Sequence, residues 1–569
     1  MRTRLSLADF PAAGAFLRAY ADPTQWSGGP MAQWFHYNPH DPQCFAQRIA
    51  ELQARPQLKE DRAFAPKIDH PYWVEAIAQQ QVLWGNGDRA ISAARSLASP
   101  NTYTVIAGQQ TGLFGGPLYS QLKAVAAIKL ADRLAKLFPD STFVPVFWMA
   151  SGDSDYEEVR RTFILNQAGE VVELALPPQV SGDNTILIAS RQIRSEQVIA
   201  LLGEELPGGE FRESVYAGVT ADYNMGYIHH CFARWMARLF RDKGLVLVDP
   251  THGELKEIAA GPLMVEELTR PAAVSDTLLT RNSSIKVAGF EPQVAWERED
   301  TNVFHVDLFE QAHRSKLIWD EHGISFKSDG GPIPSGDGEI FDADHEADEQ
   351  DHFESMAYSP GALLNPLYQD LLLRPVAFIG GAAELAYRAQ SSALADLHGM
   401  KLAPAFLRAT ATLLPQKSAD AIDELGWEVA DFYRMRDEVL KAAVALDKPE
   451  EIQRALEGYF ATIHAADIDL REAVIAFDPT LEESFETLRG NLIRHLDKLD
   501  KKITASLKQR GDTRVRRVST VHNQVYPRNQ VQERELSLLS FLPRYGFGLI
   551  DELLERLEFP SWEHQVVVV

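Results

Sequence analysis

Residues 103–119 read YTVIAGQQTGLFGGPLY, a β-branched run that leads through a glycine-dense loop into a helix. The run 103–107 is short and apolar enough to form a strand buried on both faces. Beyond the loop, apolar residues recur at helical spacing, at Leu118, Leu122, Val125, Ile128 and Leu134. A strand, a glycine turn and a helix in this order predict an α/β fold.

The loop itself is a candidate anion site. Its glycines, Gly108, Gly112, Gly115 and Gly116, let the backbone approach a ligand closely, and Pro117 fits the first position of the helix. A helix that starts behind such a turn directs unpaired N–H groups at an anion. The spacing matches neither the Walker sequence nor the dinucleotide fingerprint. Two interpretations stay open, a phosphate or nucleotide site and a tight turn that packs a helix against a sheet.

Composition excludes several classes of function. The chain has 569 residues and a formal net charge of −24, which argues against a surface built to bind nucleic acid. Cys44 and Cys231 are its two cysteines, so we expect neither a disulfide framework nor a multi-thiolate metal site. No apolar run approaches the roughly 20 residues that span a bilayer. We therefore expect a cytoplasmic protein with no membrane or nucleic-acid partner.

The strand, turn and helix pattern recurs along the chain. Apolar runs at 143–149, 244–249 and 376–379 each lie beside a polar or glycine-rich turn and a helix. This alternation predicts a doubly wound α/β core over residues 1–425, interrupted by insertions at about 170–218 and 283–355. Such sheets bind ligands at the carboxyl ends of their strands, where the glycine loop and two further motifs lie.

From residue 426 the pattern changes to long helices. Asp478 and Pro479 form a helix start, and the apolar residues that follow step by three or four positions: Leu481, Phe485, Leu488, Leu492, Leu496, Leu499, Ile503 and Leu507. We expect residues 426–512 to form a nearly straight coiled-coil arm of two antiparallel helices, with residues 513–569 packing back on the core. The apolar stripe of this arm predicts a homodimer.

Four carboxylates follow the run 143–149, among them Asp153 and Asp155 on either side of Ser154. Paired carboxylates at a strand end can orient an amine or accept a proton. They are equally typical of a solvated helix start, because acidic residues favour the first turn. Sequence alone leaves both interpretations open.

A second glycine turn, Gly380 and Gly381, opens the helix that carries Glu384, Tyr387 and Gln390. These three lie about one turn apart, so they could present polar groups on one face. The alternative is a helix with a polar outer face. Residues 514–534 bring several arginines and amides together, which either bind a nucleotide or acidic substrate or tie the arm to the core.

Two histidine groups use the residue types of metal sites. His229 and His230 are adjacent, so on a helix they point in different directions. His345, Glu346, Asp348, Asp351 and His352 lack the spacing of a known zinc motif. We therefore assign no metal to this chain.

Taken together, these segments resemble the BshC family, the cysteine ligases of bacillithiol biosynthesis. The resemblance is carried by residues 108–119 with Lys123 and by residues 145–158, 378–390, 478–481 and 529–546. It implies a Rossmann-like core similar to class I aminoacyl-tRNA synthetases, with connecting insertions and a coiled-coil arm that forms a dimer. The implied reaction joins cysteine to glucosaminyl-malate through an amide bond, with ATP, and Mg²⁺ as its counter-ion, activating the cysteine carboxylate.

The resemblance also implies roles for particular residues. The nucleotide phosphates would be held by Gly108, Gln109, Gln110, Thr111, Gly112, Gly115, Gly116, Pro117 and Lys123. Asp153 and Asp155 would orient an amine during catalysis. The substrate pocket would be completed by Ser154, Gly380, Gly381, Glu384, Tyr387 and Gln390.

The chain departs from the family pattern at its acidic motif. The family usually has a Glu before the first Asp and a His between the two, where this chain has Gly152 and Ser154, so a histidine base is absent there. Its second glycine turn also has Ala382 and Ala383 where Pro-Gly is common. The alternatives are therefore another nucleotide-dependent ligase or nucleotidyltransferase, or a dimeric binding protein with impaired catalysis. Related cysteine-activating synthetases hold the substrate thiol on a zinc bound partly by cysteine, and we do not expect two distant cysteines to rebuild that site.

Overall fold

The computed structural model describes most of the chain. The described residues are 3–7, 10–11, 13–55, 72–179, 185–307, 312–321, 323–326, 355–446, 450–510 and 512–569. The group from His345 to His352 lies outside them.

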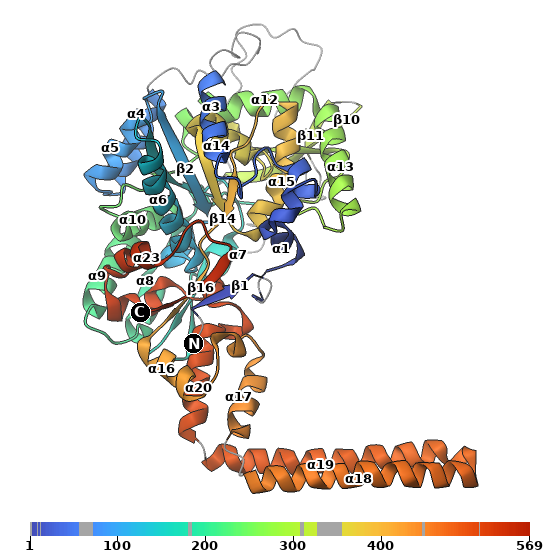
Figure 1. The fold of residues 1–569 in the computed structure, drawn as a ribbon. Coiled ribbons are helices and arrows are strands. Elements are labelled where there is room, and N and C mark those ends of the chain that lie inside the picture. Colours follow the sequence, from blue (N-terminus) through green and yellow to red (C-terminus); the bar gives the residue numbers. More distant parts are fainter. Residues whose placement is uncertain are drawn as a thin grey trace.

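The centre of the molecule is a parallel sheet of five strands (Figure 1). In spatial order these are β14 (Ala405–Leu407), β13 (Pro375–Gly380), β2 (Thr102–Gln109), β3 (Thr142–Met149) and β8 (Val246–Val248). All four neighbouring pairs run parallel. The chain proceeds outward from β2 to β3 and β8, then returns to the other side of β2 with β13 and β14. Strand order therefore reverses between β2 and β13, the point at which doubly wound sheets bind ligands.

Side chains of each strand alternate between two hydrophobic cores. On β3, Phe143, Phe147 and Met149 enter one core, whereas Val144, Val146 and Trp148 enter the other. This period of two explains why the strand is an almost uninterrupted apolar run, because both of its faces are covered by protein.

Helices cover both faces of the sheet. The first core contains side chains from α6 (Tyr119–Leu137) and α10 (Ile228–Leu239). The second contains side chains from α4 (Tyr72–Leu83), α14 (Asn365–Leu373) and α15 (Ala382–Leu397). The predicted doubly wound, Rossmann-like core is confirmed.

Two groups of smaller elements lie between the core strands. The first comprises β4 (Arg161–Leu165), β5 (Val171–Ala175), β6 (Gln192–Ile193), α8 (Glu196–Glu205), α9 (Arg212–Tyr223) and β7 (Gly226–Tyr227). The second includes an antiparallel sheet in the order β11 (Gly323–Phe326), β10 (His313–Asp320), β9 (Asp300–Asp307) and β12 (Tyr358–Pro360). The remaining helices of residues 3–373 are α1 (Ala15–Ala21), α2 (Pro30–Trp34), α3 (Cys44–Ala54), α5 (Asp88–Ser96), α7 (Tyr156–Val159), α11 (Gly253–Leu255), α12 (Gly261–Thr269) and α13 (Pro271–Val287).

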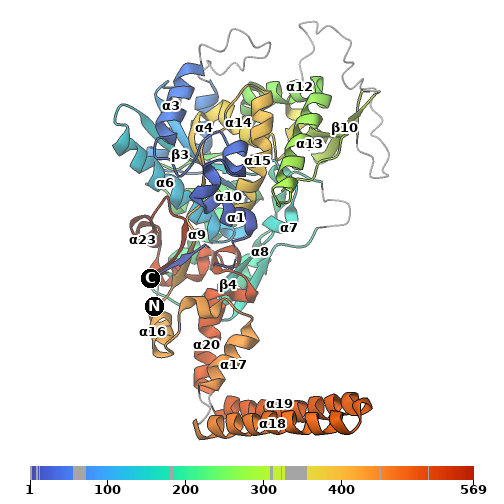
Figure 2. The ribbon, with the colours of Figure 1, turned by 45° about the vertical axis from the view of Figure 1, so that its right-hand side comes forward.

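The arm is a pair of antiparallel helices that extends far from the core (Figures 1 and 2). These are α18 (Glu450–Phe477) and α19 (Glu482–Arg510), joined at Pro479–Leu481. The side chain of Asp478 accepts a hydrogen bond from Thr480 N at 2.9 Å, so the predicted helix start is confirmed. The arm is connected to the body through α17 (Arg436–Ala445) and α20 (Asp512–Val525).

The two ends of the chain meet in a small sheet below the core (Figure 1). Its strands are β1 (Arg4–Ser6), β16 (Glu563–Val568) and β15 (Ala411–Leu414), with β16 in the middle. The other C-terminal helices are α16 (Gln416–Glu424), α21 (Gln532–Glu535), α22 (Leu542–Tyr545) and α23 (Leu549–Arg556). None of the helices in the described ranges is long and apolar enough to cross a membrane.

Candidate active site

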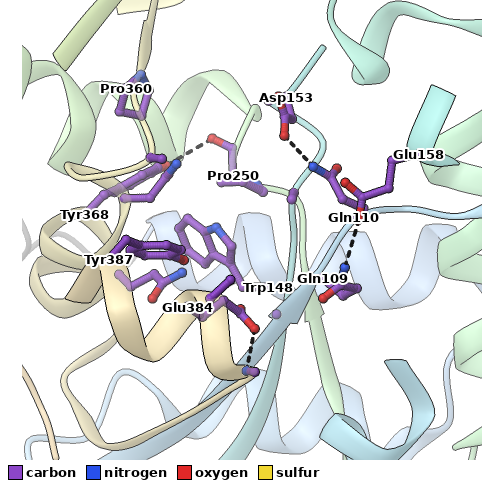
Figure 3. Close-up of a pocket in the computed structure, with 18 of the residues that line it drawn as sticks. Gln109, Gln110, Trp148, Asp153, Glu158, Pro250, Pro360, Tyr368, Glu384 and Tyr387 are labelled. Carbon is purple, nitrogen blue, oxygen red and sulfur yellow. Dashed lines mark hydrogen bonds between the residues drawn. The ribbon is translucent and has the colours of Figure 1, made fainter. Parts of the chain in front are cut away.

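A cavity of about 520 Å³ opens at the carboxyl ends of the parallel strands, at the switch point between β2 and β13. In Figure 3, Glu384 and Tyr387 of α15 lie on one side of it, and Asp153 and Glu158 lie on the other. Its lining draws on both connecting insertions and on the segment that follows the arm. The site is thus assembled from parts of the chain hundreds of residues apart.

The cavity brings together about half of the residues predicted for the site. It is lined by Gly108, Gln109, Gln110, Lys123, Asp153, Gly381, Glu384 and Tyr387. The predicted residues that are not among its lining are Thr111, Gly112, Gly115, Gly116, Pro117, Ser154, Asp155, Gly380 and Gln390. Their roles in binding stay predictions, but the structure gives a physical reason for several of these positions.

Beyond Gln110 the glycine loop turns away from the cavity and into the core. Gly115 N donates to Gly112 O and to the Tyr223 hydroxyl, both at 3.1 Å, and Gly116 N donates to Leu113 O at 2.9 Å. Gly115 has a φ of +89°, and a Cβ there would lie 2.9 Å from Trp235. These amides are therefore used within the fold, and the turn packs a helix against the sheet.

Helix α6 starts later than the sequence indicated. It begins at Tyr119, so the expectation that Pro117 occupies its first position is wrong. Leu118 N donates instead to Leu536 O at 2.8 Å, in the segment that follows the arm. This long-range contact cannot be read from the local sequence.

Lys123 lies at the base of the cavity with all three of its N–H donors engaged. Nζ donates at 2.6 Å to Gly108 O and to Gln109 Oε1, and it forms an ion pair with Glu384. Burial lowers the pKa of Lys123, and the nearby Glu384 carboxylate opposes that shift. The amine thus organises the walls of the cavity rather than extending into it.

Helix α15 presents its N-terminus to the cavity. Gly381, Ala382 and Ala383 line it, and the Glu384 carboxylate accepts a hydrogen bond from Gly381 N at 2.7 Å. The side chain of Gln390 points elsewhere. It lies six residues after Glu384, and this spacing separates the two side chains by about a third of a turn around the helix axis. The Gln390 amide is buried and bonded to Val294 and Asn282.

The two aspartates of the acidic motif have different positions. Asp153 faces the cavity, where its carboxylate accepts hydrogen bonds from the Gln110 amide and from Ser154 N and lies 3.8 Å from Arg314 Nη1. Asp155 caps α7 and accepts a hydrogen bond from Glu158 N at 3.0 Å. The helix-start interpretation therefore describes Asp155, whereas Asp153 lies where a ligand could reach it.

Glu158 also lines the cavity, although its side chain stays accessible to solvent. The surrounding protein displaces part of the water from its carboxyl group, and the charges of Asp155 and Asp153 repel a further negative charge. Together they raise the pKa of Glu158 to about 7, against the opposing effect of Lys123.

Two buried cations face the cavity from segments in which the sequence carries no motif, Arg314 from the second insertion and Lys256 from the stretch after β8. Arg314 of β10 stacks on Phe304 at 3.7 Å and donates to Pro360 O at 3.0 Å, but its Nε has no hydrogen-bond partner among the described residues. Burial lowers its pKa to about 10. Lys256 donates to Met356 O at 3.1 Å, and burial lowers its pKa to about 8.

A third cation, Arg534, comes from α21 and lies in the arginine and amide stretch that sequence analysis singled out. Its neighbours Gln532 and Glu533 are buried and bonded to the backbone of β15, at Leu413 N and Ala411 N. These contacts hold α21 against the core. Within the described part of the chain, no hydrogen bond or ion pair engages the exposed Arg534 guanidinium.

The histidine pair lies behind the cavity. His229 Nε2 is 3.5 Å from a carboxylate oxygen of Asp249, and His230 Nδ1 accepts a hydrogen bond from Trp84 at 2.8 Å. Across the described ranges, no group of three or more His, Cys, Asp or Glu side chains is placed to hold a metal ion.

The fold and the cavity define a Rossmann-like α/β protein with a small-molecule site at the switch point of its sheet and a coiled-coil arm. Comparison with protein families agrees with this class. Residues 6–409 match the N-terminal Rossmann-like domain of BshC in bacillithiol biosynthesis, and residues 411–569 match its C-terminal coiled-coil domain. The chain belongs to the BshC family, as the sequence motifs indicated.

Its relatives match over most of their length. Proteins named "Putative cysteine ligase BshC" include one from Salinibacter ruber, 28% identical over 91% of this chain and 93% of its own. Another, from Solibacter usitatus, is 29% identical over 84% of this chain and 86% of its own. A solved structure named "putative arginyl t-RNA synthetase", from Campylobacter jejuni, aligns with a TM-score of 0.19 at 11% identity, covering 85% of this chain and 98% of its own. The expected likeness to class I synthetases stays a prediction.

Proposed function

We propose that this protein is a ligase that joins the carboxyl group of cysteine to the amine of glucosaminyl-malate and uses ATP to activate the cysteine. The observation that carries this proposal is the cavity at the switch point, whose lining holds both carboxylates, at Asp153, Glu158 and Glu384, and cations, at Lys256, Arg314 and Arg534. Carboxylates attract an amine, and cations attract phosphate and carboxylate groups. Bacillithiol biosynthesis, the pathway of the family, supplies the identity of the substrates.

The phosphates of ATP fit best at the N-terminus of α15. This helix has 16 residues, and Gly381, Ala382 and Ala383 at its start line the cavity. Arg534 adds an exposed cation without a partner of its own in the described structure. A helix N-terminus and an arginine together form a favourable anion site. We therefore assign the phosphates to this second glycine turn rather than to the first, whose amides are engaged.

The malyl group fits the part of the cavity lined by Arg314 and Lys256, which lie near enough to affect each other's charge. A dicarboxylate there would meet two cations whose opposing charges, within the described residues, are Asp153 for Arg314 and Asp249 for Lys256. Buried charges that are poorly compensated bind an opposite charge strongly. With the malyl group there, the amine would point toward Asp153.

The replacement of the family histidine by Ser154 is compatible with activity. Ser154 does not line the cavity, whereas the carboxyl group of Glu158 does. This arrangement favours a ligase over a binding protein with impaired catalysis. A different nucleotide-dependent ligase would share the phosphate site but would not need Arg314 and Lys256.

We further propose a cytoplasmic homodimer formed through the arm. Helix α18 has 28 residues, and none of them is buried in one chain. Large apolar side chains are exposed along both helices, including Tyr459, Ile468, Leu488 and Leu499. A second copy would cover this surface.

The ligase proposal is tested by a reaction with glucosaminyl-malate, cysteine and ATP in which each component is omitted in turn. Mass spectrometry should detect bacillithiol only in the complete mixture. Asp153→Asn should lower the rate strongly, whereas Glu157→Gln, which changes a carboxylate that pairs with Arg160 outside the cavity, should not. No bacillithiol in the complete mixture would contradict the proposal.

A further inference from the structure

The cavity contains one carboxylate that is not committed to another group. In the described part of the chain, three carboxylates line it, at Asp153, Glu158 and Glu384. Glu384 is paired with Lys123 and caps α15. Asp153 accepts two hydrogen bonds and faces Arg314. Among the described residues, the Glu158 carboxylate receives one hydrogen bond, a long one from Gln109 Nε2 at 3.4 Å, so most of its lone pairs are available to a ligand.

The position of Glu158 is controlled from the base of the cavity. Lys123 can only donate hydrogen bonds, so the amide oxygen of Gln109 must face it, at 2.6 Å. The amide nitrogen is thereby turned outward, where it donates to the Tyr119 hydroxyl at 3.2 Å and to Glu158 Oε1 at 3.4 Å. Gln109 thus always offers a donor to Glu158, which orients that carboxyl group as an acceptor.

The charges around Glu158 suit a group that takes up a proton near neutral pH. Asp155 and Asp153 on its own segment and Glu384 on α15 disfavour its ionised form, in addition to the loss of water. Lys123 on α6 favours the ionised form. The resulting pKa of about 7 is close to the value that serves a general base best in this pH range.

We propose that Glu158 is the proton acceptor of the ligation step and that Lys123 and Gln109 are its positioning residues. This inference rests on the proposed ligase function. The amine nitrogen attacks the carbonyl carbon of a cysteinyl–phosphate anhydride, forming the C–N bond. The C–O bond to the phosphate breaks, and the phosphate leaves with the electron pair. The proton that the nitrogen loses moves to the Glu158 carboxylate and from there to solvent.

The test is the pH dependence of kcat/KM for bacillithiol formation between pH 5.5 and 9. The wild-type rate should decline below a pH of about 7, where Glu158 becomes protonated. Glu158→Gln should lower the rate by about 100-fold or more and remove this dependence, since a positioned base contributes roughly 10²–10⁴-fold. Glu157→Gln is the matched control, because its carboxylate lies outside the cavity lining, and it should keep both the rate and the profile.

Two further variants separate a base from a structural group. Asp155→Asn keeps an N-cap for α7 but removes a charge that raises the pKa of Glu158, so it should move the decline to lower pH. Gln109→Leu removes a hydrogen-bond donor to the ionised Glu158 carboxylate. The decline in rate should therefore move to higher pH, with kcat changing more than KM. If the wild type makes bacillithiol and Glu158→Gln has the wild-type rate and pH profile, the role of Glu158 is overturned but the ligase function is not. Absence of product from the wild type would overturn the ligase function with it.

Discussion

Lys123 and Glu384 form an ion pair across the switch point of the sheet. Lys123 lies on the helix after β2 and Glu384 on the helix after β13, the two strands between which the strand order reverses. The pair closes the base of the cavity, and each partner also holds backbone groups of the two glycine turns, Gly108 O and Gly381 N. The two motifs that the sequence presents separately are thus one structural unit.

Loss of this pair should destabilise the protein. Lys123→Met removes a buried cation and leaves the Glu384 carboxylate and the Gly108 carbonyl without their donor. Breaking a buried ion pair from one side costs about 3–5 kcal/mol. Urea unfolding should show a loss of this size. Lys136→Met, at an exposed position of the same helix, should change the free energy of unfolding by less than about 0.5 kcal/mol, and equal stabilities of the two variants would contradict the account.

Arg534 should contribute to nucleotide affinity. Arg534 lines the same cavity as the N-terminus of α15, and its guanidinium has no partner in the described structure. A hydrogen bond to a charged group contributes about 1.5–3 kcal/mol, so Arg534→Gln should weaken ATP binding by roughly 10- to 100-fold in calorimetry. Arg517→Gln removes an exposed arginine that pairs with Glu424 and serves as the control. Unchanged affinity in Arg534→Gln would place the phosphates elsewhere.

Arg314 should select for the malyl carboxylates. Arg314→Gln should raise the KM for glucosaminyl-malate by about 10-fold or more and leave the KM for ATP nearly unchanged, because we assign Arg314 to the malyl carboxylates and Arg534 to the phosphates. Steady-state kinetics with each substrate varied separately gives both values. If the KM for ATP rose instead, the assignment of these two arginines would be reversed.

His398 should make stability depend on pH. Burial disfavours the charged form of His398, but its ring nitrogens donate hydrogen bonds to the carboxylates of Glu266 and Glu267, which raises its pKa above the usual value of 6.5. A histidine whose pKa is higher in the folded state than in the unfolded state stabilises the fold when it is protonated. This stabilisation is fully present at pH values below the unfolded-state pKa and is lost as the pH rises through the folded-state pKa. His398→Gln should therefore cost about 2 kcal/mol near pH 5.5 and progressively less above neutral pH.

Thermal unfolding of this variant and the wild type over pH 5.5–9 measures that dependence. His464→Gln, an exposed change on the arm, should leave the wild-type profile intact. A difference between wild type and His398→Gln that grows with pH would show that the histidine is neutral in the folded protein.

The arm should hold two copies of the chain together. Leu488 and Leu499 are 51% and 48% exposed and lie eleven residues apart, on one face of α19. Replacing both with Lys should convert a dimer into a monomer in size-exclusion chromatography with light scattering. Glu483→Lys reverses a charge on the same helix without changing the apolar stripe and should remain dimeric. A monomeric wild type would contradict the proposal.

The core strands could be predicted from sequence because each is an apolar run with a clear boundary. The predicted segments 143–149 and 376–379 lie within β3 and β13. The helices α6 and α15, which follow the glycine turns after β2 and β13, are recognisable from the helical spacing of their apolar residues. The family motifs also gave the Rossmann-like core and the coiled coil, which the comparisons confirm.

The details of the site could not be predicted because they depend on long-range packing. The first glycine loop is held by Tyr223 and Trp235, which lie more than a hundred residues further along the chain. Arg314 of the second insertion and Lys256 of the stretch after β8 belong to no motif, so only the fold shows that they face the cavity. Arg534 lay in a stretch that sequence analysis noted, but nothing local distinguished it from its neighbours.

The most direct measurement follows the oxygen atoms of cysteine. The wild-type protein is incubated with glucosaminyl-malate, ATP and cysteine labelled with ¹⁸O in both carboxyl oxygens, and the products are analysed by mass spectrometry. Ligation through an activated carboxylate predicts bacillithiol that retains one ¹⁸O, with the other transferred to AMP or to phosphate. If bacillithiol forms but neither AMP nor phosphate carries ¹⁸O, or if no bacillithiol forms, activation of the cysteine carboxylate by ATP is contradicted.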